Sequence, residues 1–155
     1  MFVVESYETA AGTRLLNGSC NSNVPNAVPP SAPVVLEEIV DTFMAKLTMT
    51  YKVAVAVVPK NPLMVSVEYT DTSTGFLLSV EEDFINELTQ EELEAAIAHE
   101  LGHVWIFTHH PFLQTEVLAN QIAQRLVPRT SLVQVYEKVW RRQGTKGDLS
   151  RFVGD

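Results

Sequence analysis

Two histidines and a glutamate have the spacing of a metal site: His99, Glu100 and His103 form an HExxH motif. On a helix, residues four apart share a face, so both imidazoles can point at one ion. Glu100 lies one position further round, within reach of a water bound to that ion. Zinc lowers the pKa of such a water to about 7, and a carboxylate can then take its proton. The motif therefore predicts one Zn²⁺ ion and hydrolysis by a metal-bound water that Glu100 activates as general base.

A catalytic zinc usually takes three protein ligands and a water, and two residues compete to be the third ligand. Glu116 lies on the next expected helix, and Asn120 shares its face and could hydrogen-bond a ligand histidine. His109 is the rival, because it follows the second motif histidine at the spacing of the HExxHxxGxxH pattern. That pattern needs a glycine where this chain has Ile106, and a later methionine, whereas none follows Met64. We therefore predict Glu116 as the third ligand.

A donor to the tetrahedral oxyanion would complete the site. The sequence offers five candidates without placing any of them: His109, His110, Tyr51, Tyr69 and Tyr136. For the two histidines an exposed helix end is the plainer expectation, because a histidine is favourable near the C-terminal dipole.

The motif needs a helix to carry it, and the surrounding residues predict one. Thr89 is a typical N-cap, and Glu92 completes a capping box for a helix that runs through residue 107. Pro111 marks its end. A second helix is expected over residues 112–127, stopped by Pro128, and a last one begins near residue 130. The metal ligands therefore come from two consecutive helices.

Earlier residues predict a helix and a small sheet. Apolar side chains recur at helical spacing at Leu36, Ile39, Val40, Phe43, Met44 and Leu47. Strands are expected at 52–58, 63–70 and 76–81, with a hairpin turn at 71–75. Residues 1–33, rich in Asn, Gly and Pro, read as an irregular arm with a short strand near 2–7. We expect an α+β domain over 34–155, in which a small mixed sheet packs on the active-site helix, with backing and C-terminal helices.

Composition and charge limit the class of protein. The chain has 155 residues, 46% of them apolar, which suits one globular domain. A net charge of −8 argues against nucleic acid and anionic membranes as partners. The single cysteine, Cys20, excludes an internal disulfide, and we expect an ordinary thiol there. With no apolar stretch near the ~18 residues of a membrane span and no secretory signal, we expect a soluble, cytoplasmic protein; its oligomeric state is not predicted.

Two segments resemble zinc peptidases. The motif helix is similar to that of the gluzincins, closest to the heat-shock membrane protease and CAAX prenyl protease group, over Thr89-Gln-Glu-Glu-Leu-Glu-Ala-Ala-Ile-Ala-His-Glu-Leu-Gly-His103. Residues 116–128 resemble the ExxAN…LLxP stretch of ImmA/IrrE-type peptidases. The short gap between His103 and Glu116 is similar to that of the minimal soluble gluzincins, or minigluzincins. Asn120 departs from the commoner aspartate of the first group.

The resemblance implies a zincin-like fold and a metallopeptidase that acts on peptides or proteins, with His99, His103 and Glu116 on zinc and Glu100 as base. It also implies that strand 76–81 is an edge strand that docks substrate backbone, with an ordinary hairpin strand as the alternative. A latent enzyme and a zinc-binding interaction or sensor module with little or no hydrolysis are the other functional readings. The intact HExxH argues against the module, because structural zinc sites are usually closed by four ligands.

Overall fold

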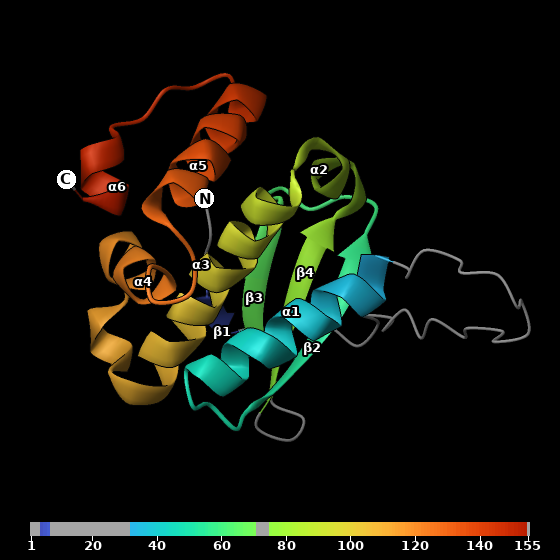
Figure 1. Cartoon of the computed structure of the whole chain (residues 1–155), viewed down its shortest axis with the longest axis vertical. Coiled ribbons are helices and arrows are strands. Elements are labelled where there is room, and N and C mark those ends of the chain that lie inside the picture. Colours follow the sequence, from blue (N-terminus) through green and yellow to red (C-terminus); the bar gives the residue numbers. More distant parts are fainter. Residues whose placement is uncertain (1–3, 7–31, 71–74, 155) are drawn as a thin grey trace, which may run out of the picture.

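The computed structural model describes residues 4–6, 32–70 and 75–154, with the backbone alone for residues 4–6. A mixed sheet carries α1 (Ala32–Lys46) and α3 (Gln90–His109) side by side on one face (Figure 1). On the other side of α3 pack α4 (Glu116–Ala123) and α5 (Arg129–Gln143), and α6 (Leu149–Val153) packs against α4 and α5. This confirms the α+β expectation. Most of the expected arm, Cys20 included, lies outside the described residues.

The sheet has the order β1-β3-β4-β2, with strands at Val4–Ser6, Val65–Thr70, Gly75–Glu81 and Lys52–Val58. Strand β4 runs antiparallel to β3, as the hairpin predicts, and parallel to β2. The expectation that residues 76–81 form an edge strand is wrong, because β4 pairs on both sides and all its residues are buried. A continuous apolar run such as Phe76-Leu77-Leu78 is typical of a strand covered on both faces. The outer edge of β3 is taken by β1, in parallel.

The helix that carries the motif forms where the sequence predicts it. The Thr89 hydroxyl accepts from the Glu92 amide at 3.2 Å, and the Glu92 carboxylate accepts from the Thr89 amide at 3.0 Å. The Lys138 ammonium of α5 (Arg129–Gln143) donates to the same carboxylate at 2.8 Å. The capping box therefore fixes the start of α3 and also ties α5 to it.

The segment after α3 differs from the expected helix over 112–127. A 3₁₀ turn, η1 (Pro111–Leu113), comes first, and α4 covers only Glu116–Ala123. The Thr115 hydroxyl accepts from the Leu118 amide at 3.1 Å and caps α4 there. Glu116 is therefore the first residue of its helix. Two short helices were not predicted, α2 (Glu82–Glu87) and α6 (Leu149–Val153).

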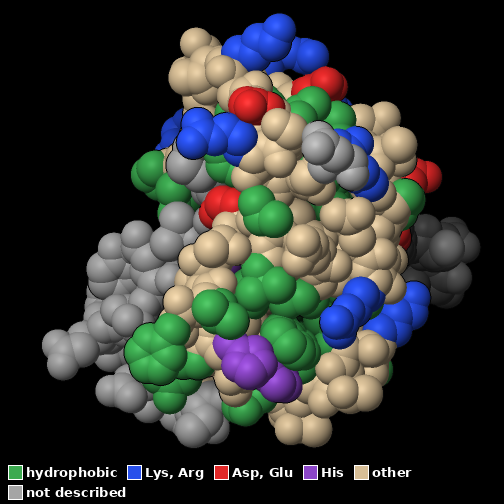
Figure 2. Space-filling model, turned by 90° about the vertical axis from the view of Figure 1, so that its left-hand side faces the viewer, with side chains coloured by type: hydrophobic (Ala, Val, Ile, Leu, Met, Phe, Trp, Pro, Cys, Tyr) green, Lys and Arg blue, Asp and Glu red, His purple; other side chains and the backbone are tan. Residues whose placement is uncertain are grey.

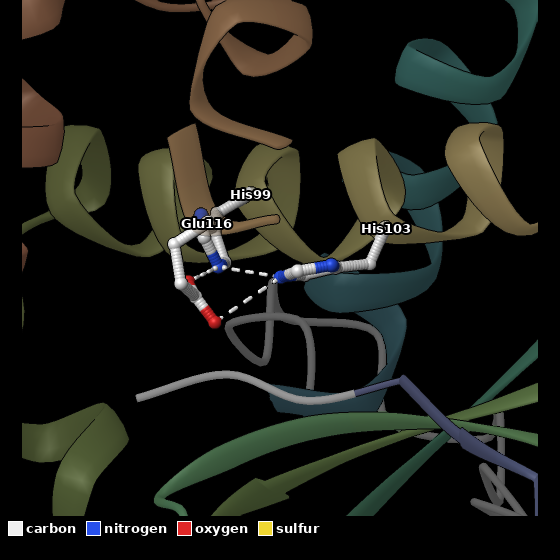
Figure 3. Close-up of side chains that lie close together, drawn as sticks. All are labelled: His99, His103 and Glu116. Atoms are coloured by element: carbon white, nitrogen blue, oxygen red, sulfur yellow. Dashed lines mark hydrogen bonds and ion pairs between the residues drawn. The ribbon is translucent and has the colours of Figure 1, made fainter. Parts of the chain in front are cut away.

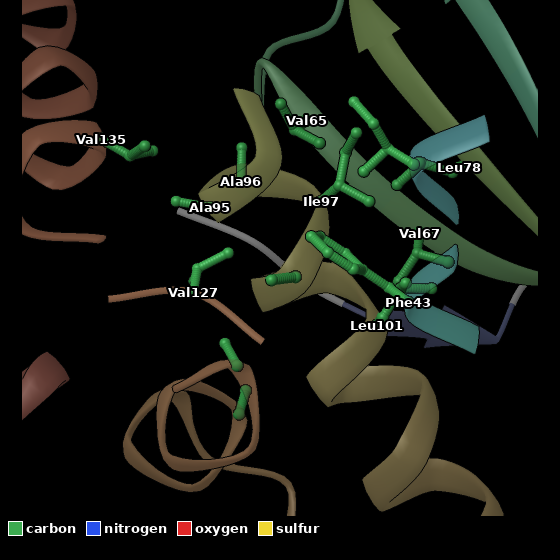
Figure 4. Close-up of a cluster of buried hydrophobic side chains, with 14 of the residues drawn as sticks. Phe43, Val65, Val67, Leu78, Ala95, Ala96, Ile97, Leu101, Val127 and Val135 are labelled. Carbon is green, nitrogen blue, oxygen red and sulfur yellow. The ribbon is translucent and has the colours of Figure 1, made fainter. Parts of the chain in front are cut away.

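The core surrounds α3 on two sides (Figure 4). Ile97 and Leu101 point toward the sheet side chains Val65, Val67 and Leu78 and toward Phe43 of α1. On the opposite side, the small residues Ala95 and Ala96 let Val127 and Val135 approach closely. Because both sides of α3 are covered, its central turns are buried. No helix of the described residues is long and apolar enough to span a membrane.

Candidate metal centre

Three side chains converge between α3 and α4 (Figure 3). The Nε2 atom of His99 lies 3.0 Å from Oε2 of Glu116 and 3.1 Å from Nε2 of His103. The Nε2 atom of His103 lies 3.6 Å from Oε1 of Glu116. One potential ligand atom of each residue lies within 4.8 Å of the others. The structure thus brings together the three residues that the sequence nominates as ligands.

The close crossing of α3 and α4 makes this convergence possible. Gly102 lies between the two motif histidines, and a β-carbon built on it would overlap the carbonyl oxygen of Ala119. Ala119 lies between Glu116 and Asn120 along α4. The two helices therefore meet with almost no side chain between them, which brings the α4 residues within reach of the histidines.

His99 is held by a chain of oriented hydrogen bonds. The Asn120 amide nitrogen donates to the Phe152 carbonyl at 2.7 Å and to the Tyr136 hydroxyl at 2.9 Å. The Asn120 oxygen must therefore face Nδ1 of His99, 2.6 Å away, so that Nδ1 carries the proton. The Tyr136 hydroxyl in turn donates to Oε2 of Glu116 at 3.1 Å. Asn120 occupies the supporting position expected for it, and the network links both helices to α5.

His103 has an amide partner that sequence reasoning missed. The oxygen Oε1 of Gln114 lies 2.8 Å from Nδ1 of His103. Gln114 follows the short turn η1, outside any periodic element, so no pattern in the sequence marks it. With Nδ1 of both histidines engaged by an amide oxygen, both bare Nε2 atoms face Glu116.

Electrostatics at the site favour a neutral His99 and an ionised Glu116. Burial lowers the pKa of His99, which is fully buried, below its usual value. Burial raises the pKa of Glu116, but its close contacts with the side chains of His103 and His99 outweigh this effect and hold that pKa well below its usual range. Imidazole lone pairs and a carboxylate repel one another at such distances unless a cation lies between them. A proton can serve one pair, whereas a divalent metal ion serves all three groups, so the donor set fits such an ion.

Glu100, the expected general base, differs from Glu116 in its hydrogen bonding and in the direction of its pKa shift. It is fully buried, and neither carboxylate oxygen has a hydrogen-bond partner in the described part of the chain. Burial, and then the negative charge of Glu116, raise its pKa well above the usual value. The backbone of Val67 in β3 approaches the carboxylate and opposes this shift without reaching hydrogen-bond geometry. Glu100 therefore faces the sheet side of α3 as a carboxylate with a strong tendency to hold a proton.

His109, the rival for the third ligand position, lies outside the group formed by His99, His103 and Glu116. Its ring stacks on Trp105, with centroids 4.2 Å apart, and its Nδ1 donates to the Trp105 carbonyl at 2.8 Å. Both His109 and His110 are exposed, and Figure 2 shows surface histidines beside hydrophobic side chains. The structure thus matches the plainer expectation for these two residues at the end of α3.

Of the tyrosines considered as oxyanion donors, one reaches the site. The Tyr136 hydroxyl is already engaged with Asn120 and Glu116. Tyr69 packs on Phe76 and Phe107, and Tyr51 contacts the edge of Phe76. The described contacts therefore assign none of the three to an oxyanion.

Comparisons with known proteins identify the family. The model of peptidase family M48 matches residues 36–153. A solved structure of abylysin from Pyrococcus abyssi, described as a metallopeptidase zymogen, is similar with a TM-score of 0.51. Its identity is 13%, over 73% of this chain and 99% of that chain, so this likeness shows the fold alone. None of the curated proteins matches the chain. Because the family match covers most of the chain and includes every residue of the site, the chain belongs to peptidase family M48 and is a metallopeptidase.

Proposed function

We propose that His99, His103 and Glu116 hold one Zn²⁺ ion and that Glu100 is the general base of peptide-bond hydrolysis. The convergence of two imidazoles and a carboxylate supports this assignment most strongly. Two imidazoles and one carboxylate suit zinc and leave a fourth position for water, as catalytic zinc sites require. Peptides or proteins are the substrates, as the family implies.

Glu100 carries the proton between the two steps of the proposed reaction. When bound, zinc lowers the pKa of a water molecule and polarises the scissile carbonyl. Glu100 takes a proton from the attacking water and passes it to the nitrogen of the leaving amine. A base must hold that proton between the two steps, and the raised pKa of the buried Glu100 favours this. Among the described residues neither carboxylate oxygen has a hydrogen-bond partner that would compete with the water.

Replacing Glu100 by Gln tests its role in the reaction separately from metal binding. The zinc-loaded wild type is expected to cleave members of a peptide library, and Glu100→Gln to lose at least about 100-fold in kcat/KM while keeping one zinc per chain. Glu91→Gln, on the exposed face of the same helix, is the matched control and is expected to retain activity. Retained turnover in Glu100→Gln would remove Glu100 from the mechanism.

A second candidate is that residues 1–31 keep the enzyme latent. Strand β1 pairs with the outer edge of β3, with Val4 opposite Val67. Val67 is the residue whose backbone approaches Glu100. A peptide that added its backbone to this edge would compete with β1.

Deleting residues 1–31 tests latency and the binding-module alternative together. Higher turnover in the truncated chain than in the full chain supports latency, and equal, measurable turnover excludes it. Full-length and truncated chains that both bind one zinc, stay folded and cleave nothing in the library would favour the binding module instead.

A further inference from the structure

We infer that Gln114 is a positioning residue of the metal site, which fixes the tautomer and the ring orientation of His103. The inference rests on the proposed role of His103 as a ligand. Its evidence is separate from that role, because it comes from two hydrogen bonds between a single amide and a single residue.

Both ends of the Gln114 amide engage His103. The amide nitrogen donates to the main-chain carbonyl of His103 at 2.9 Å, and Oε1 lies 2.8 Å from Nδ1 of its ring. A main-chain carbonyl can only accept, so the nitrogen must be the end that faces it. The oxygen is then the end at Nδ1, and this ring nitrogen must carry the proton.

A proton on Nδ1 determines the state of the other ring nitrogen of His103, Nε2. A neutral imidazole with its proton on Nδ1 has its lone pair on Nε2, the atom that faces Glu116 and His99. The alternative tautomer would place a proton on Nε2 and would have to exchange it before a metal could bind. Because Gln114 spans the ring and the backbone of the same residue, it restrains the ring relative to the axis of α3.

Each histidine has its own amide partner: Asn120 contacts His99, and Gln114 contacts His103. Asn120 is fully buried, and its orientation is fixed by Phe152 and Tyr136. Gln114 is half-buried, at the junction between η1 and α4, and its orientation is fixed by His103 itself. Each imidazole thus has its own neutral amide acceptor, and Glu116 is the one carboxylate of the proposed ligand set.

The test compares two side chains of similar length. Gln114→Met keeps the unbranched shape and removes both hydrogen bonds, whereas Gln114→Glu keeps an acceptor for Nδ1. The exposed Gln121 of α4 provides the control, Gln121→Met. Zinc affinity is measured by competition with a chromogenic chelator. We expect Gln114→Met to bind zinc about 10- to 100-fold more weakly than wild type, Gln114→Glu to recover part of that loss, and Gln121→Met to match wild type.

A second readout follows the tautomer directly. Long-range ¹H–¹⁵N spectra of the metal-free protein at pH 8 report which nitrogen of His103 is protonated. We expect proton occupancy on Nδ1 in wild type and a mixture of tautomers in Gln114→Met. Should Gln114→Met lose cooperative thermal unfolding, zinc affinity and the His103 tautomer are compared between wild type and Gln114→Glu instead. Zinc affinity and tautomer that both stay at wild-type values in Gln114→Met, or a wild-type His103 protonated on Nε2, would overturn the inference.

His103→Ala separates this inference from the proposed function. If His103→Ala binds zinc as tightly as wild type, His103 is no ligand and both proposals fail. If His103→Ala loses zinc while Gln114→Met matches Gln121→Met, the ligand assignment stands and only the role of Gln114 is refuted.

Discussion

Gly102 and Ala119 meet at the crossing of the two helices that carry the proposed ligands. A side chain on Gly102 would overlap the carbonyl oxygen of Ala119, which is backbone and cannot rotate away. Gly102 is flanked by the histidines of α3, and Ala119 by Glu116 and Asn120 of α4. The distance between the helices, and with it the reach from Glu116 to the imidazoles, therefore depends on a missing β-carbon.

Gly102→Ala is expected to push α4 away from α3. Overpacking of this kind costs about 1–3 kcal/mol of unfolding free energy, and the displaced Glu116 should weaken zinc binding at least about tenfold. Denaturant unfolding and chelator competition measure the two effects, with Gln121→Ala on the exposed side of α4 as control. Zinc affinity equal to that of the control would show that the crossing does not position Glu116.

The choice between Glu116 and His109 as third ligand can be tested with two variants. Glu116→Gln removes the charge that faces both imidazoles, so we expect it to lower zinc affinity by at least about 100-fold. His109→Ala removes a ring that stacks on Trp105, and zinc affinity should stay at the wild-type value. Isothermal titration of the metal-free proteins with zinc gives both constants. The reverse pattern would assign the metal to the HExxHxxGxxH arrangement instead.

The sequence predicts those parts of the site that depend on helical periodicity. The spacing of His99 and His103 on one helix, the capping box at Thr89 and the shared face of Glu116 and Asn120 all follow from local geometry. The apolar face of α1 follows in the same way. Each of these features needs only the 3.6-residue repeat and nearby hydrogen bonds, which is why they could be read without a structure.

The parts that were missed depend on contacts between distant segments. The place of β4 in the sheet is decided by its pairing with both β2 and β3, although its unbroken apolar run was a usable signal. Gln114 finds its partner eleven residues back along the chain, across a turn without periodicity. Helix α4 begins later than expected because Thr115 caps it at Glu116. The prediction of a helix over 112–127 did not use this capping signal.

The capping box gives a prediction for acid stability. Burial raises the pKa of Glu92, but hydrogen bonds from Lys138 and Thr89 outweigh it and lower that pKa below its usual value. A lowered folded-state pKa means that the stabilisation is complete above the unfolded pKa of about 4.3 and is lost as pH falls further. Glu92→Gln should therefore be less stable than wild type by about 1–2 kcal/mol at pH 7, and the gap should narrow below about pH 4.

Thermal midpoints of both proteins from pH 7 to pH 3 measure this gap, with Glu91→Gln on the same helix turn as control. A gap that stays constant over the whole range would show that the Glu92 carboxylate does not need its charge.

The central claim is that one zinc ion lies between α3 and α4. Crystals of the zinc-loaded protein, measured on both sides of the zinc absorption edge, give an anomalous difference map that locates the ion without assumptions about its ligands. We predict a single strong peak at about 2.0–2.2 Å from Nε2 of His99, Nε2 of His103 and a carboxylate oxygen of Glu116. A peak bound by His109, or no peak at this crossing in zinc-loaded crystals, would contradict the account.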